Sequence, residues 1–471
     1  MNQTRSLLTG ALLSCLMLTS FLLPRPVTAR EILTPEQKAN LDAVVNPLIE
    51  GEWIQGLAIG VATESGTQTF SYGHVAGADS PPPDGQTLWE IGSMSKVFTG
   101  VLLADAATAG QVDVNDPVNK YLPPEAQLPQ NDGADVLLWH LATHTSGLPR
   151  LPSNMELTDL VNPYAAYTFE QLLAYLPTAK YESTVGKKHS YSNLGIGLLG
   201  YVLARRADVS YEELLAARLL KPLGMDSTCI TLDDERRARM AAGHNSDGDE
   251  VGWWDLPTLA GAGAIRSTAD DMLKFLSANA GMTDSELLPA FKLSHEPRFT
   301  INEGMKVGLC WNMMVGNGVV WHNGETGGFH AFGGFHPEKK LAVVVLANSA
   351  CRYVDPLAQR VYQLLLNKPA EPLKLRATVS VEPEKLSPLV GKYLLSLTSV
   401  MEITQEADQL YLQLTGQPRF KLFASEENKF FLRVVEAEVV FERDADGTCD
   451  KLVLHQNGLK LPAARITAKE E

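Results

Sequence analysis

WEIGSMSKVFTG, residues 89–100, is the stretch that decides the fold of this sequence, because it places Ser93 three residues before Lys96. If a helix begins at the serine, residues three apart lie on one face, so the lysine reaches the serine hydroxyl. A lysine whose pKa is lowered by burial or by nearby cations can take the proton of that hydroxyl. The positive end of the helix dipole also favours negative charge that develops beside the serine. The spacing predicts a serine nucleophile with a lysine activator.

A second cluster, YSN at residues 191–193, stands at the start of a strongly helical pattern over residues 192–221. The loop before it, residues 186–189, contains two lysines, and a phenol near two ammonium groups loses its proton more easily. Tyr191 is therefore a candidate general base toward the serine and a later acid toward the leaving group. The side-chain carbonyl of Asn193 is predicted to hold the motif's lysine. The alternative is a helix-capping residue beside a core tyrosine.

A third cluster is WHNGETGGF, residues 321–329. Its glycines let the backbone of a strand approach a ligand closely. The N–H groups of Glu325 and Ser93 are then candidate donors to an oxyanion. The alternative is a glycine-rich hairpin, in which His322 is structural.

In this order, the three clusters resemble those of the serine β-lactamase and penicillin-binding-protein superfamily, closest to its class C β-lactamase-like branch. That branch carries Ser-x-x-Lys, Tyr-x-Asn, and Lys-Thr-Gly or a His-x-Gly variant. The stretches at residues 141–149, 222–228 and 264–271 also look typical of it. The resemblance covers roughly residues 32–366.

The resemblance implies hydrolysis through an acyl-enzyme, with no metal and no cofactor. The implied catalytic residues are the acylated nucleophile Ser93, its hydrogen-bonded activator Lys96 and the acid/base Tyr191. The implied substrate-binding residues are Asn193, which also anchors Lys96, and the strand residues His322, Asn323, Gly324 and Glu325, the amide of Glu325 completing the oxyanion hole with that of Ser93.

The third cluster departs from most class C β-lactamases, because His322 stands where those have lysine. A histidine with a reference pKa of about 6.5 is mostly neutral, whereas a lysine is a permanent charge for a substrate carboxylate. His-x-Gly versions look like those of esterases, D-amino-acid peptidases and low-activity penicillin-recognising proteins. We therefore expect a secreted serine hydrolase that cleaves a β-lactam, a D-alanyl peptide or a small ester. The alternative is a penicillin-recognising binding or scaffold protein that is acylated slowly with little turnover.

Other features exclude further classes of protein. No Gly-x-Ser-x-Gly stretch occurs, which excludes an α/β-hydrolase elbow. The net charge of −15, without clustered Lys and Arg, excludes a nucleic-acid surface. His140 and His144 have no Glu between them, so packing or local hydrogen bonding is favoured over zinc binding. The cysteines at positions 229, 310, 351 and 449 leave one disulfide open and require none.

Residues 1–29 are predicted to be a signal peptide cleaved after Ala29, which makes the mature protein periplasmic or secreted. Lipidation at Cys15 is less favoured because the apolar run continues past it. No later apolar run approaches the length of about 20 residues that spans a bilayer. The sequence assigns no oligomeric state.

The remaining chain divides into an α+β domain over residues 30–368, a linker over 369–383 and a small all-β, barrel-like domain over 384–471. The first is expected to combine an antiparallel sheet, flanked by helices, with a mostly helical subdomain. The last resembles the lipocalin-like domain that is often appended to such hydrolases. A turn at residues 444–447 is predicted to close a hairpin rather than to bind calcium.

Overall fold

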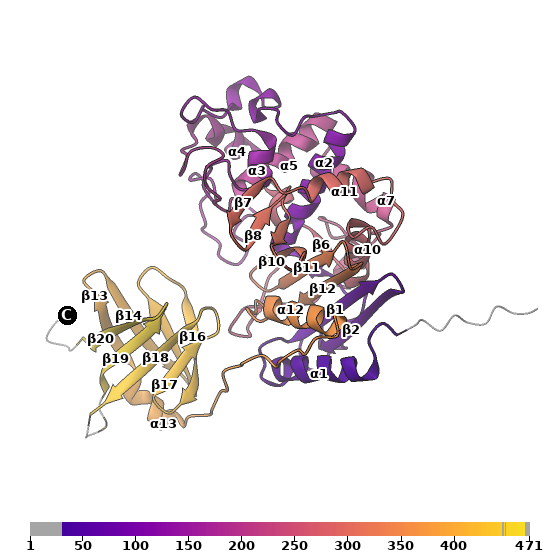
Figure 1. Cartoon of the computed structure of the whole chain (residues 1–471). Coiled ribbons are helices and arrows are strands. Elements are labelled where there is room, and N and C mark those ends of the chain that lie inside the picture. Colours follow the sequence, from indigo (N-terminus) through magenta and orange to yellow (C-terminus); the bar gives the residue numbers. More distant parts are fainter. Residues whose placement is uncertain (1–30, 445–446, 448, 467–471) are drawn as a thin grey trace, which may run out of the picture. The chain divides into compact units, whose positions relative to one another are not determined.

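Eight strands form one antiparallel sheet in the order β2-β1-β12-β11-β10-β9-β8-β7 (Figure 1). The computed structural model describes residues 31–444, 447 and 449–466. The strands are β1 (Gly56–Thr63), β2 (Gly66–Gly73), β7 (Phe299–Asn302), β8 (Met305–Val307), β9 (Asn312–Met314), β10 (Val320–Glu325), β11 (His330–His336) and β12 (Leu341–Ala347). The antiparallel sheet expected for the first domain is thereby confirmed.

The central strand β12 is buried along its whole length because helices cover both faces of the sheet. Successive side chains of a strand point to opposite faces. Val343 and Val345 accordingly belong to one apolar cluster, and Val344 and Leu346 belong to another. The two clusters are separate cores on the two faces of the sheet.

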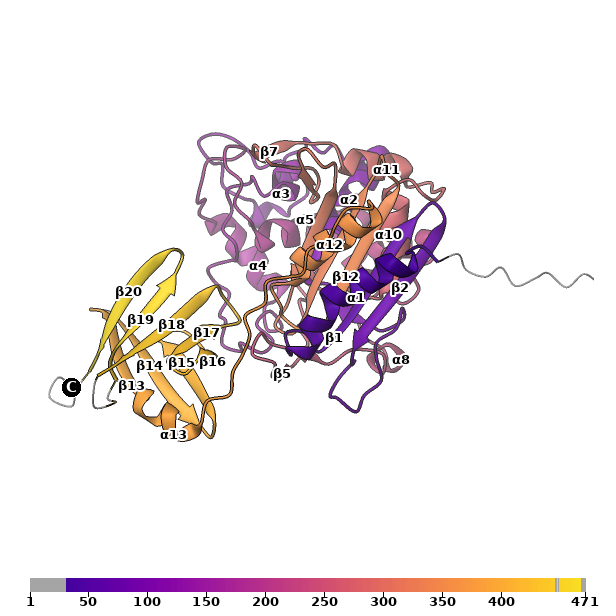
Figure 2. The same ribbon diagram turned by 60° about the horizontal axis from the view of Figure 1, so that its bottom comes forward.

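On one face, α1 (Pro35–Glu50) and α12 (Val354–Leu365) pack against each other and against the sheet, as Figure 2 shows. A capping box between Thr34 and Gln37 fixes the start of α1. On the other face, α10 (Ala269–Asn279) contacts β1, β11 and β12. The buried helix α2 (Ser95–Thr108) packs on that side against α5, α9 and α11.

Short helices make up the subdomain beside this second face, as predicted. They are α3 (Leu138–Ala142), α4 (Phe169–Tyr175), α5 (Asn193–Ala207), α6 (Tyr211–Leu215), α7 (Lys221–Leu223), α8 (Asp234–Arg237), α9 (Ala260–Gly263) and α11 (Leu288–Ser294). Two short ladders, β3 (Trp89–Glu90) with β6 (Arg266–Ser267) and β4 (Gly243–His244) with β5 (Glu250–Val251), join the loops.

Two predicted helix boundaries were wrong. The helix expected over residues 192–221 ends where Asp208 adopts φ +55°, and a new helix begins after the Ser210 cap. Pro222, directly after the expected helix, lies inside α7. Ser93 does not open α2 but lies in the 3₁₀ turn Gly92–Met94 just before it. The tight turn is possible because Gly92 has φ +48°, which favours glycine.

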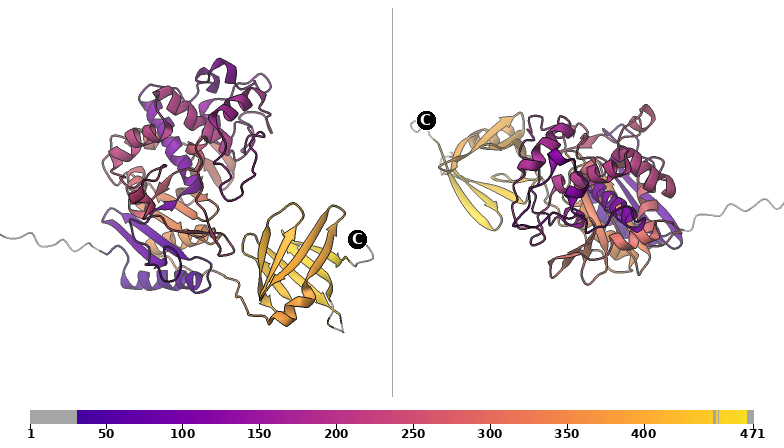
Figure 3. Two further views of the ribbon diagram at one scale, coloured as in Figure 1. Left: turned by 180° about the vertical axis from the view of Figure 1, so that it is seen from behind. Right: turned by 90° about the horizontal axis from the view of Figure 1, so that it is seen from above.

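After α12, the described chain has neither helix nor strand until α13 (Pro383–Leu386). Eight antiparallel strands then form a closed barrel, which Figure 3 shows from two directions. They are β13 (Gly391–Ser396), β14 (Ser399–Glu406), β15 (Gln409–Leu414), β16 (Arg419–Glu426), β17 (Lys429–Leu432), β18 (Ala437–Arg443), β19 (Cys449–Gln456) and β20 (Leu459–Arg465). Alternate side chains, among them Met401, Ile403 and Phe430, fill its interior. The predicted barrel-like domain is confirmed.

Several predictions concern the ends and turns of the chain. The predicted signal peptide, with Cys15, lies outside the described residues. Strands β18 and β19 pair as an antiparallel hairpin on either side of residues 444–447, of which 445 and 446 are not described. Among the described helices, none combines the length and the apolar character that crossing a bilayer requires.

Candidate active site

A cavity of about 420 Å³ brings the three sequence clusters together between the helical subdomain and strand β10. It is lined by Gly92, Ser93, Arg150, Tyr164, Tyr191, Asn193, Trp254, Leu256, Ala262, Gly263, Asn323, Gly324, Glu325 and Thr326. Residues far apart in the sequence thus converge on one concave site, as ligand sites require.

Lys96 lies in the first turn of α2 and is completely buried. Its Nζ donates to Ser93 Oγ over 2.9 Å and to the carbonyl of Ala262 over 2.6 Å. Because burial disfavours the ammonium form, the pKa of Lys96 falls to about 7. A large fraction of the lysine is therefore a neutral amine near neutral pH.

Tyr191 precedes α5, whose start is capped by Ser192. Its ring centroid lies 4.4 Å from that of His144, 4.8 Å from Lys96 Nζ and 5.2 Å from the Arg150 guanidinium. Burial raises the pKa of Tyr191 to about 12, although a hydrogen bond with Ser93 and the charge of Arg150 act in the opposite direction. The expectation that nearby ammonium groups lower the pKa of this phenol was wrong, because desolvation is the largest influence on that pKa and raises it.

Asn193 is 7% exposed and borders the same cavity. Its Nδ2 donates to the hydroxyl of Tyr164 over 3.3 Å, and its Oδ1 has no hydrogen-bond partner in the described part of the chain. The predicted bond to Lys96 is not formed, because Lys96 donates to the Ala262 carbonyl instead. A buried carbonyl without a partner is available to a ligand N–H.

Strand β10 approaches the turn at Ser93 so closely that each of the two segments needs a glycine at the contact. A Cβ on Gly324 would lie 1.9 Å from the carbonyl oxygen of Ile91, and a Cβ on Gly92 would lie 2.7 Å from the amide nitrogen of Glu325. The backbone of Glu325 and the backbone of Ser93 therefore border the cavity side by side.

His322 and Asn323, the other two predicted substrate-binding residues of the strand, do not present their side chains to this cavity. His322 is buried and is not among the residues that line the cavity; burial lowers its pKa to about 4, so it is neutral. Asn323 borders the cavity, but its Nδ2 donates to Asp355 Oδ2 on α12 over 2.7 Å. Alternation along β10 explains the difference, since Asn323 points opposite to its neighbours.

Three residues that were not predicted from the sequence complete the cavity wall: Arg150, Tyr164 and Trp254. Arg150 is fixed by its backbone, because its carbonyl accepts the N–H groups of Asn193 (3.0 Å) and Leu194 (3.1 Å). Its exposed guanidinium has no ion-pair partner among the described residues. Only its position directly after the TSGLP stretch at 145–149 points to it in the sequence.

The two histidines considered for zinc accept backbone hydrogen bonds, locally for His140 and from a residue 48 positions away for His144. His140 Nδ1 accepts the N–H of Leu137 (3.1 Å), and His144 Nδ1 accepts the N–H of Ser192 (3.1 Å). Within residues 31–444, 447 and 449–466, no group of three or more His, Cys, Asp or Glu side chains is placed to hold a metal ion. The four cysteines of this part of the chain are free and buried.

Comparison with known proteins agrees with this geometry. The family model described as Beta-lactamase matches residues 41–368. The chain belongs to the β-lactamase family. A second model, described as a Domain of unknown function (DUF3471), matches residues 375–467, which include the barrel.

Two curated relatives in this family are each 30% identical to the chain. A β-lactamase of Yersinia enterocolitica is 30% identical over 73% of this chain and 94% of its own length. The D-alanyl-D-alanine-carboxypeptidase/endopeptidase AmpH of Escherichia coli is 30% identical over 78% of this chain and 98% of its own length.

Solved structures of the family are also similar. A β-lactamase/D-alanine carboxypeptidase from Pseudomonas syringae is 25% identical, with a TM-score of 0.62 over 72% of this chain and 100% of its own. A D-alanine carboxypeptidase from Burkholderia cenocepacia is 27% identical, with a TM-score of 0.60 over 69% of this chain and 98% of its own. The chain is thus a serine hydrolase of the class C β-lactamase and AmpH type.

Proposed function

We propose that the protein hydrolyses β-lactams or D-alanyl peptides through an acyl-enzyme on Ser93. The observation that carries this proposal is the buried Lys96 Nζ, which lies 2.9 Å from Ser93 Oγ and has a pKa of about 7. A lysine in this state can accept a proton, and a serine needs such a base to become a nucleophile.

Acylation begins when the neutral amine of Lys96 accepts the proton of the Ser93 hydroxyl. Ser93 Oγ then attacks the carbonyl carbon of the substrate, and the carbonyl oxygen becomes an oxyanion. The amides of Ser93 and Glu325 border the cavity side by side and are the proposed donors to this oxygen.

The leaving nitrogen needs a proton when its bond to the acyl carbon breaks. Tyr191 is protonated at neutral pH, because its pKa is about 12, and its hydroxyl faces Ser93. It donates this proton and recovers one from the Lys96 ammonium. In deacylation, the neutral amine of Lys96 accepts a proton from water while the water oxygen bonds to the acyl carbon. The bond from that carbon to Ser93 Oγ then breaks, Oγ recovers a proton from the Lys96 ammonium, and the acid is released.

Recognition of a negatively charged substrate falls to Arg150 rather than to His322. His322 is buried and neutral, whereas the Arg150 guanidinium lies at the cavity beside Tyr191 and has no ion-pair partner among the described side chains. Guanidinium groups bind carboxylates with two parallel hydrogen bonds. The carbonyl Oδ1 of Asn193 is the proposed acceptor for an amide N–H of the substrate. These features favour carboxylate-bearing amides over neutral esters.

We also propose that the protein is exported and that the chain after the signal peptide divides into two domains joined by a linker. Residues 1–29 have the pattern of a cleaved signal peptide, which favours export. We assign residues 30–368 to the hydrolase, 369–383 to a linker and 384–471 to the barrel domain, whose first and last strands β13 and β20 fall inside that last range.

The test compares the wild type with Arg150→Ala on nitrocefin, on a D-alanyl-D-alanine peptide and on p-nitrophenyl butyrate. Loss of a charge-assisted contact raises KM for the two anionic substrates by about tenfold or more and leaves the neutral ester unaffected. Arg206→Ala is the matched control, because Arg206 is exposed on α5 and does not line the cavity.

Two outcomes would overturn the assignment. Turnover of the ester without turnover of either anionic substrate would make the protein an esterase. A stable adduct with no turnover of any substrate would support the binding or scaffold protein instead.

A further inference from the structure

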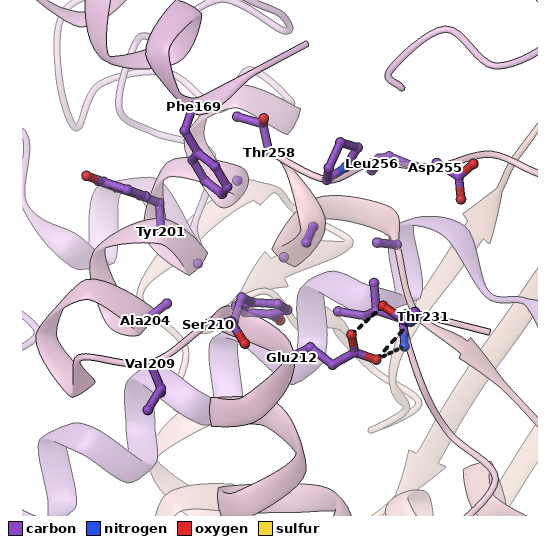
Figure 4. A pocket seen from close by; sticks show the side chains of 18 of the residues that line it. Phe169, Tyr201, Ala204, Val209, Ser210, Glu212, Thr231, Asp255, Leu256 and Thr258 are labelled. Carbon is purple, nitrogen blue, oxygen red and sulfur yellow. Dashed lines mark hydrogen bonds between the residues drawn. The ribbon is translucent and has the colours of Figure 1, made fainter. Parts of the chain in front are cut away.

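A second cavity, of about 1160 Å³, lies between α5, α6 and residues 253–260, and contains none of the proposed catalytic residues (Figure 4). Small-molecule sites in proteins measure roughly 300–1,000 Å³, so this cavity has room for a whole ligand.

Large apolar side chains stand open to water at this cavity. Phe169 is 41% exposed and Val209 is 43% exposed, and both line it. Figure 4 shows Phe169 beside Tyr201, and their ring centroids are 5.6 Å apart. Tyr211 and Trp253 add two more aromatic rings to the lining. Exposed apolar groups gathered in a concave site indicate a binding surface for an apolar body.

Two carboxylates of the lining are already occupied by protein donors. Glu212 accepts the N–H groups of Ile230 and Thr231, each over 2.8 Å, and the Thr231 hydroxyl over 2.7 Å, as the dashed lines in Figure 4 show. Asp255 is paired with Arg266 over 3.0 Å. Neither carboxylate is free for a cationic ligand.

The arginines of the lining are less occupied. Arg205 is exposed and has no side-chain partner among the described residues, and Arg237 only packs over the Trp253 ring at 5.8 Å. Asp208 is the one lining carboxylate that has no side-chain partner among the described residues. The three arginines and three carboxylates of the lining therefore balance in charge, but the two guanidinium groups that lack a carboxylate partner among the described residues can donate hydrogen bonds to an anion.

We propose that this cavity is a second ligand site, which takes an amphipathic anion with a bulky apolar or aromatic body. The body lies among Phe169, Tyr201 and Val209, and the carboxylate or sulfonate group meets Arg205 and Arg237.

The site is separable from the catalytic cavity. Among the lining residues, Leu256 is the one that the two cavities share, and Arg150 belongs only to the catalytic cavity. A ligand that bound in the catalytic cavity would therefore respond to a change at Arg150, and a ligand in the second cavity would not. Ligand binding in the second cavity can therefore be tested independently of the proposed function.

The experiment uses two fluorescent probes with one aromatic skeleton, anilinonaphthalene sulfonate and its uncharged analogue N-phenylnaphthylamine, with the full-length protein. The wild type binds the sulfonate about tenfold or more tightly than the neutral probe, because charge-assisted contacts add to the apolar ones. The double variant Arg205→Glu, Arg237→Glu abolishes that difference and keeps the neutral probe bound. Both arginines are exposed, so the fold tolerates the change.

A filling variant and two controls complete the design. Ala204→Trp occupies the cavity and weakens binding of both probes. Arg206→Glu, a neighbouring exposed arginine outside the lining, and Arg150→Ala leave both affinities unchanged. Equal binding of the two probes by the wild type, or loss of binding in Arg150→Ala, overturns the proposal.

Discussion

The two cavities of the hydrolase domain differ in volume and in the chemistry of the side chains at each. The cavity at Ser93 measures about 420 Å³ and the cavity between α5 and α6 about 1160 Å³. The smaller one adjoins a lysine and includes a tyrosine whose pKa values are shifted to about 7 and about 12. In the larger one, the carboxylates of Glu212 and Asp255 are held by protein donors. Convergent groups with shifted pKa values, rather than volume, are the reason we propose the smaller cavity as the reaction centre.

Replacing the base should break this comparison most severely. Lys96→Met keeps the volume of the buried side chain and removes the amine that lies 2.9 Å from Ser93 Oγ. We expect kcat/KM to fall by about 10⁴-fold, the upper range for loss of a general base. Steady-state kinetics with nitrocefin measure it, and circular dichroism verifies the fold. Activity within tenfold of the wild type would show that Lys96 is not the base.

The close approach of β10 provides the next largest effect. Gly324→Ala places a Cβ 1.9 Å from the Ile91 carbonyl oxygen, so the strand must move and take the Glu325 amide with it. We expect kcat/KM to fall by about 10²- to 10³-fold, as for loss of an oxyanion donor. Gly304→Ala is the matched control, because its nearest neighbour atom would lie 3.5 Å away. Equal activity of the two variants would place the oxyanion site elsewhere.

A pH profile sharpens the assignment of the base. Because the active form of Lys96 is the neutral amine and its pKa is about 7, kcat/KM should fall about tenfold per pH unit below that value. Above it, activity should stay level to strongly alkaline pH, since the pKa of Tyr191 is about 12.

Glu90 provides the control for this profile. Its buried carboxyl has a pKa raised to about 7, mainly by desolvation, and accepts the N–H of Trp254 in the cavity wall over 2.7 Å. The acidic limb should remain in Glu90→Gln. Its disappearance in that variant would assign the limb to Glu90 rather than to Lys96.

The smallest expected effect concerns the wall between the cavities, helix α9. The Thr99 hydroxyl donates to the Gly261 carbonyl over 2.7 Å and lies 2.6 Å from the Tyr211 hydroxyl. Thr99→Val leaves buried polar groups unpaired, which should lower the free energy of unfolding by about 1–3 kcal/mol. We expect kcat/KM to change by less than about fivefold, because a single net hydrogen bond is worth about 1 kcal/mol. Denaturant unfolding measures the first effect, and Thr99→Ser should restore it. A fall in kcat/KM well beyond this limit, in a variant that stays folded, would show that the two cavities are coupled.

Much of the fold and of the catalytic core could be predicted because local patterns carry them. The spacing of Ser93 and Lys96, with the tyrosine motif at residues 191–193, predicted side chains that the fold brings to one cavity. The alternating segments after residue 384 predicted the barrel. These patterns reflect helix and strand periods, which one sequence displays directly.

What the sequence did not predict depends on packing between distant segments. Arg150 enters the site because its carbonyl binds the start of α5, a contact without a local pattern. The pKa of Tyr191 rises because the whole site excludes water, which neighbouring lysines in the sequence do not reveal. Asn323 turns to Asp355 on α12, a partner 32 residues away.

The most direct test of the account is the intact mass of the protein, quenched with acid during turnover of a penicillin. The account predicts a wild-type species heavier by the whole penicillin, since ring opening releases no fragment, with the adduct mapped to the peptide that contains Ser93. The same treatment of Ser93→Ala should give no adduct and no turnover. An adduct of equal yield in Ser93→Ala, or turnover by that variant, would contradict an acyl-enzyme on Ser93.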